Sequence, residues 1–123
     1  MPIQTRSRDG VHILELQGDF TLGPQIARPL DLTGRPVDDL LIALDRLLEQ
    51  GAAKILLDLG AVNFMDSAGL GRLVACKKRA ILHGGDIRIL RPSRRVRELL
   101  EITLLDRVFE IFDDETAAVT AAR

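Results

Sequence analysis

The residues of this chain whose types and spacing could support chemistry are gathered between Asp66 and Gly71. Asp66 and Ser67 stand side by side there, directly before an apolar repeat that predicts a helix from about Ala68 to Leu82. A hydroxyl in the first turn of a helix lies next to backbone N–H groups that have no partner within the helix. A phosphate on Ser67 would be tolerated there, because the amino end of a helix is positive and rich in donors. Ser67 therefore places a hydroxyl where an anionic group is tolerated.

Two glycines in the same stretch indicate a surface that a partner approaches closely. Gly69 and Gly71 fall in the predicted first turns, where each costs about 1 kcal/mol relative to alanine. Helix stability therefore does not explain them, whereas a partner could come close to backbone that carries no side chain. We expect the binding surface to consist of Asp66, Ser67, Ala68, Gly69, Leu70 and Gly71, with Ser67 at the surface beside a patch that includes Leu70 and the two glycines.

Several polar residues also have a plainer explanation. Ser67 could serve only as the N-cap of the helix. Asp66 could be only a turn residue, rather than a group that positions Ser67 or contacts the metal and nucleotide of a partner. Cys76, on the same predicted helix, is interpreted as a small packing residue. His12 is interpreted as a sheet residue, and His83 as a solvated residue at a helix end.

Composition argues against several classes of function. The formal net charge is -1, and the chain contains 3% aromatic residues, with no Trp or Tyr. Direct nucleic-acid binding is not expected without a basic surface or stacking aromatic side chains. A lone cysteine and two histidines predict no zinc site. Nothing in the order of residues suggests a Ser-His-Asp triad, and Gly69-x-Gly71 is too short for a dinucleotide fingerprint. We expect no catalytic residues, no metal and no cofactor.

The chain is expected to form one cytoplasmic domain over residues 1–123. Its length is typical of a single domain. No apolar stretch approaches the roughly 18 residues that span a membrane. The first residues, MPIQTRSRDG, contain no apolar core typical of a signal peptide. Membrane insertion is therefore not expected.

Hydrophobic periodicity and turn residues predict the elements that position the candidate site. Ile3–Arg8 and a strand from Val11 form a hairpin around Asp9-Gly10, and Gly18-Asp19-Phe20 ends the second strand. An extended loop over 21–36 is expected next, followed by a helix over Val37–Gln50, a strand over Lys54–Leu59 and a loop over Gly60–Asp66. The helix over Ala68–Leu82 should then place Leu70, Leu73, Val74 and Ile81 on its inner face. The remaining elements are a strand over Asp86–Leu90, a helix capped by Ser93, a last strand over Val108–Phe112 and a terminal helix capped by Asp113 or Asp114.

This order of elements predicts the α/β class. After the hairpin, strands and helices alternate, and each crossover is long enough to connect parallel strands. We expect a mixed, mostly parallel sheet of four to five strands with about four helices packed on it.

The chain resembles a STAS domain of the anti-sigma factor antagonist group. The resemblance rests on Leu57-Asp58-Leu59 and on the run from Phe64 to Gly71. It extends to Gly18-Asp19 after the hairpin. It also includes three later segments, which are Gly84-Gly85, Arg91 to Ser93 and Leu99 to Phe112. The resemblance implies a single STAS domain and adds Asp19 to the expected partner-binding residues.

The resemblance also implies a mechanism. In such proteins the serine after the aspartate is phosphorylated by a small ATPase-type serine kinase that is also the anti-sigma factor. The unphosphorylated antagonist binds that kinase and frees the sigma factor, and a phosphatase is a further partner to consider. Ser67 takes the place of the phosphoacceptor. Two departures are Ala68, where the family often has Ser or Thr, and the long segment 21–36.

Two other functions stay open. One is a constitutive STAS scaffold or regulatory subunit of a transporter or stress-signalling complex, which partner binding insensitive to the state of Ser67 would favour. The other is an enzyme, for which the sequence offers no signature. Charge is also uneven: Lys77 to Arg97 is basic and Glu98 to Glu115 is acidic, which predicts either solvated helix faces or steering toward a partner.

Overall fold

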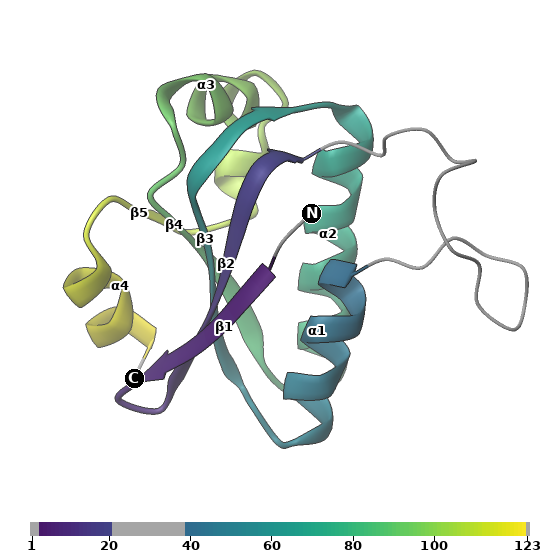
Figure 1. Ribbon diagram of the computed structural model, residues 1–123, viewed down its shortest axis with the longest axis vertical. Helices are drawn as coiled ribbons and strands as arrows, with labels where there is room; N and C mark the ends of the chain where they lie inside the picture. Colours follow the sequence, from purple (N-terminus) through teal and green to yellow (C-terminus); the bar gives the residue numbers. More distant parts are fainter. Residues whose placement is uncertain (1–2, 21–38, 123) are drawn as a thin grey trace, which may run out of the picture.

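The computed structural model describes residues 3–20 and 39–122 (Figure 1). The predicted loop 21–36 lies outside the described residues, as do residues 37 and 38 of the first predicted helix. The elements are β1 (Ile3–Arg8), β2 (Val11–Phe20), α1 (Asp39–Glu49), β3 (Lys54–Met65), α2 (Ser67–Leu82), β4 (Asp86–Leu90), α3 (Arg94–Ile102), a 3-10 helix (Leu105–Arg107), β5 (Ile111–Phe112) and α4 (Glu115–Ala122).

The five strands form one mixed sheet in the order β1-β2-β3-β4-β5. Strands β1 and β2 are antiparallel, and each later neighbour pairs in parallel. The hairpin turn has positive φ at Asp9 and Gly10, as a tight two-residue turn requires. The predicted fold class is confirmed, including the hairpin and the parallel remainder. The last strand is shorter than predicted, because a 3-10 helix ends at Arg107 and only Ile111 and Phe112 pair with β4.

Helices cover both faces of the sheet. Figure 1 shows α1 and α2 on one side and α4 on the other. The main core lies under α1 and α2, and it contains the predicted leucines of α1, which are Leu40, Leu44, Leu47 and Leu48. A smaller core under α4 joins Val11, Ile13, Leu56 and Leu90 to Ala118, Val119 and Ala122.

One inward-facing residue of α2 was predicted wrongly. Leu70 and Leu73 are buried, but Ile81 is 55% exposed. The core face of α2 continues from Leu73 to Cys76 and Ala80, because two helical turns take about seven residues. Ile81 lies one residue further around the helix and reaches solvent.

The predicted loop over Gly60–Asp66 is wrong, because β3 continues to Met65. Two register shifts against β2 mark β-bulges: Glu15 pairs with Asp58 but Gln17 with Ala61, and Gly18 pairs with Val62 but Asp19 with Phe64. Each bulge adds one residue to β3 and breaks its alternation. The residues of β3 in the main core are therefore Ile55, Leu57 and Leu59, spaced by two, and then Val62 and Met65, spaced by three.

Within the described part of the chain, no helix combines the length and the apolar character that crossing a membrane requires.

Candidate protein-binding site

Asp66, and not Ser67, caps helix α2. The backbone of Asp66 is extended, and its carboxylate oxygen Oδ1 accepts a hydrogen bond of 2.8 Å from the N–H of Gly69. Its backbone carbonyl accepts from the N–H of Leu70 at 3.0 Å. Ser67 is the first helical residue and is exposed. The prediction of Ser67 as the N-cap is therefore wrong: Ser67 is an exposed residue of a helix that Asp66 caps.

The rest of the predicted surface divides into exposed and buried residues. Gly71 is exposed, and a Cβ added to it would meet nothing within 4 Å. Ala68 is half-buried, whereas Gly69 and Leu70 are buried. Leu70, predicted both for the inner face of the helix and for the binding patch, is 7% exposed and belongs to the main core, so its inward-facing position is confirmed and its place in a surface patch is wrong. Its position lies one turn before Leu73, on the stripe that packs α2 onto the sheet.

Asp19 lies at the same edge of the sheet as Ser67. In the parallel pairing of β2 with β3, Asp19 is opposite Phe64 and Phe20 is opposite Met65. Asp66 and Ser67 follow Met65 directly. The carboxyl ends of the two strands therefore bring the backbone of Asp19 next to the start of α2.

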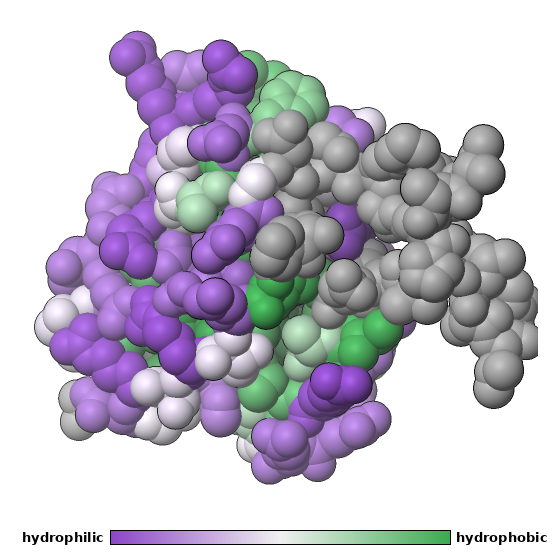
Figure 2. Space-filling model, in the orientation of Figure 1, coloured by the Kyte–Doolittle hydropathy of each residue, from purple (hydrophilic) through white to green (hydrophobic). Residues whose placement is uncertain are grey.

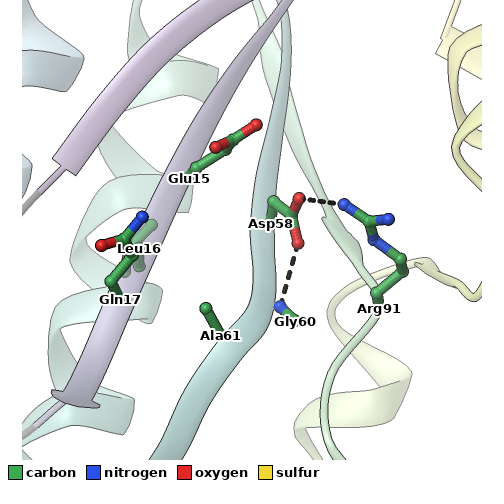
Figure 3. Close-up of a pocket in the computed structure, with 7 residues that line it drawn as sticks. All are labelled: Glu15, Leu16, Gln17, Asp58, Gly60, Ala61 and Arg91. Carbon is green, nitrogen blue, oxygen red and sulfur yellow. Dashed lines mark hydrogen bonds and ion pairs between the residues drawn. The ribbon is translucent and has the colours of Figure 1, made fainter.

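A polar hollow of about 450 Å³ lies over β2 and β3, lined by Glu15, Leu16, Gln17, Asp58, Gly60, Ala61 and Arg91 (Figure 3). Asp58 is 5% exposed; its carboxylate accepts two hydrogen bonds there and lies 3.8 Å from the Arg6 guanidinium. It accepts from the Arg91 guanidinium at 2.5 Å and from the N–H of Gly60 at 2.9 Å. The hydrogen bond from Arg91 to Asp58 raises the pKa of the guanidinium. Asp58 thus satisfies the backbone N–H at the first bulge of β3, which is a structural task.

A second ion network continues from this hollow toward α4. Arg6 contacts the carboxylates of Glu15 and Glu115, and Arg8 pairs with Glu115 at 3.1 Å. The hydrogen bond from Arg6 lowers the pKa of Glu115 to about 2. Figure 2 shows that the face carrying β1 and α4 is mostly hydrophilic. These ion pairs fasten α4 to the opening hairpin.

The basic and acidic blocks of the sequence pair with each other. Arg88 contacts Glu110 at 3.2 Å, Arg94 contacts Glu98 at 3.3 Å, and Arg97 contacts Asp113. Three of the cations in the basic block are therefore matched by acids of the block that follows. Among residues 3–20 and 39–122, no group of three or more His, Cys, Asp or Glu side chains could hold a metal ion.

The STAS domain family model matches residues 2–118, and the chain belongs to this family. Within it, the relatives are anti-sigma factor antagonists. The chain is 34% identical over 79 residues to a candidate anti-sigma factor antagonist of Thermotoga maritima, which covers 64% of this chain and 70% of the relative. It is 26% identical over 121 residues to the anti-sigma F factor antagonist of Paenibacillus polymyxa, which covers 98% and 93%.

Solved structures agree with this assignment. A crystal structure of a candidate anti-sigma factor antagonist from Thermotoga maritima superposes with a TM-score of 0.77 at 26% identity, over 98% of this chain and 94% of the other. The phosphorylated form of the Bacillus cell fate determinant SpoIIAA has the same fold, with a TM-score of 0.67 at 18% identity, over 99% of this chain and all of the other. The resemblance that rested on Leu57 to Leu59 and on Phe64 to Gly71 is confirmed at the level of the family.

Proposed function

We propose that this chain is a cytoplasmic anti-sigma factor antagonist that binds its partner through the start of α2 and is switched by phosphorylation of Ser67. The observation that carries the proposal is that Ser67 is exposed at the first position of α2 while Asp66 makes the cap. The hydroxyl is therefore accessible to a kinase, and the helix does not depend on it.

The proposed partner is an anti-sigma factor that is also a small ATPase-type serine kinase, and a phosphatase would reverse the reaction. The names of the relatives support an anti-sigma factor as partner. SpoIIAA, which has the same fold, has been solved in a phosphorylated form. The partner surface would include Asp66, Ser67 and Gly71, with Asp19 at the neighbouring strand end.

A phosphate on Ser67 would change the surface and leave the fold intact. It adds a charge of about -2 and three acceptor oxygens. The N–H groups of Gly69 and Leu70 already have partners in Asp66, so the N–H groups before them are those left for a phosphate. The Asp66 carboxylate stands beside the new charge and directs it outward by repulsion. A partner that fits the neutral surface would then meet an uncompensated dianion at the centre of the contact.

The test combines phosphorylation with binding. Each small ATPase-type serine kinase of the source genome is incubated with the purified chain and ATP, and mass spectrometry locates the phosphate. We expect modification at Ser67, and calorimetry with the same kinase should show weaker binding of the phosphorylated chain. Equal affinity of both forms would favour the constitutive scaffold. We also propose that the chain itself is not an enzyme. Sustained hydrolysis of ATP or GTP by the purified chain, abolished by a single substitution in the chain, would contradict this proposal.

A further inference from the structure

An exposed apolar groove lies directly beside the start of α2. Its walls are Phe64 at the end of β3 and Leu99 and Ile102 on α3. Its floor is formed by Met65 and Val96, which are almost fully buried. Phe64 is 44% exposed and Ile102 is 78% exposed. We refer to this feature as the Phe64 groove.

The second bulge of β3 is what places Phe64 at the surface. Strict alternation between Val62 and Met65 is impossible, because both lie in the main core with two residues between them. The register shift leaves both Asn63 and Phe64 facing away from that core. The chain has only four phenylalanines and no Trp or Tyr, so an aromatic residue held at the surface is unusual for its composition. Exposed apolar patches on small domains commonly mark sites of interaction.

The size and charge of the groove favour one kind of occupant. Its volume is about 180 Å³, below the roughly 300–1,000 Å³ of typical small-molecule pockets. Its rim carries one cation and one anion, Arg95 and Glu98, and so has no net charge. An ion or a nucleic acid is therefore a poor fit, whereas one large apolar side chain of a protein fits well. Aromatic and aliphatic anchors of this kind are typical hot spots of protein interfaces.

The groove lies close to Ser67, because Phe64 is near Ser67 along the chain. Phe64 precedes Ser67 by three residues, so their Cα atoms lie within about 11 Å of each other. A partner seated on Ser67 would reach the groove without spanning a gap, since standard interfaces bury about 800 Å² per partner.

We infer that the Phe64 groove is an anchor site for the kinase that binds at Ser67, and that it takes an apolar side chain of that kinase. This inference rests on the proposed function. The groove supplies affinity that does not depend on charge, whereas Ser67 supplies the switch.

The experiment measures the affinity of the unphosphorylated chain for each small ATPase-type serine kinase of the source genome by calorimetry. Phe64→Ala and Ile102→Ser are compared with Leu82→Ser, a matched control. Leu82 is 83% exposed at the far end of α2, about 22 Å from Ser67 along the helix. We expect each groove variant to weaken binding about tenfold or more, and the control to stay within about twofold of wild type.

The dependence of binding on salt concentration separates the apolar contribution of the groove from the electrostatic effect of a charge at Ser67. The loss for the groove variants should be similar at low and high salt, whereas the loss for Ser67→Asp should shrink as salt screens the charge. Circular dichroism checks that all variants fold. If Phe64→Ala does not fold, Ile102→Ser still tests the groove.

Each alternative outcome is distinct. Weakening by Ser67→Asp with unchanged binding of both groove variants overturns this inference and leaves the proposed function standing. A wild-type dimer that becomes a monomer on Phe64→Ala, with kinase binding unchanged, identifies a second copy as the occupant and also overturns it. Failure of every kinase to bind the wild-type chain overturns the proposed function and this inference together.

Discussion

The carboxylate of Asp66 accepts a hydrogen bond of 2.8 Å from the backbone N–H of Gly69, so the residue before Ser67 caps the helix that Ser67 begins. The two adjacent polar residues therefore have separate tasks. Asp66 stabilises the helix end, and Ser67 presents a hydroxyl whose modification need not disturb it.

The first prediction separates these tasks by stability. Asp66→Ala should lower the free energy of unfolding by about 0.5–2 kcal/mol through loss of the cap. Asp66→Asn keeps an acceptor of the same shape and should lower it less. Ser67→Ala should change it by less than about 0.5 kcal/mol, as expected of an exposed residue. Urea denaturation measures all three, and a larger loss for Ser67→Ala than for Asp66→Ala would contradict the assignment of the cap.

The second prediction concerns the switch. Ser67→Asp should bind the kinase more weakly than wild type, while Ser67→Ala should bind about as well, because alanine adds neither bulk nor charge. The aspartate carries one charge, so its effect should be smaller than that of phosphoserine. Calorimetry with circular dichroism as a folding check measures this. Ser7→Asp, on exposed β1, adds the same charge elsewhere and should bind normally.

The third prediction tests the core beneath α1. Leu44 is fully buried, so Leu44→Ala should cost about 2–5 kcal/mol of stability. Ile42 on the same helix is 39% exposed, and Ile42→Ala should cost markedly less. Similar midpoints of chemical denaturation for the two variants would show that α1 does not pack as described.

The fourth prediction concerns pH. The pKa of Glu115 is about 2 in the folded chain, against 4.5 for the free group, because Arg6 donates to its carboxylate. A carboxyl whose pKa falls on folding stabilises the folded state above its unfolded pKa, and this contribution disappears as pH falls from about 4.5 to about 2. Glu115→Gln should therefore lose less stability than wild type over that window, in urea titrations at several pH values. Parallel curves for the two proteins would contradict the Arg6–Glu115 contact.

The sequence predicted those elements whose signals are local. The Asp9-Gly10 turn, the leucine repeat of α1 and the caps at Ser93 and Asp114 all depend on residues within a few positions of each other, and all are present. The parallel pairing of the later strands followed from the alternation of strands and helices along the chain.

The extent of β3 beyond Leu59 could not be predicted from local sequence signals. Its core residues change from a spacing of two to a spacing of three at Leu59, which in a sequence is indistinguishable from the end of a strand. The bulges depend on the register of pairing between β3 and β2, which is a tertiary feature. For the same reason the exposure of Phe64 could not be predicted from the sequence. Asp66 and Ser67 were both recognised, but which of them makes the cap depends on backbone geometry.

The pairing of Arg88 with Glu110 and of Arg97 with Asp113 has a kinetic consequence. Because three cations of the basic block pair with acids of the acidic block and the chain carries a net charge of -1, a diffusing partner meets a reduced field of either sign. Association should then proceed at an unsteered rate constant, on the order of 10⁵–10⁷ M⁻¹s⁻¹. A phosphate at the contact would act chiefly on the lifetime of the complex, so that the antagonist would be released by faster dissociation.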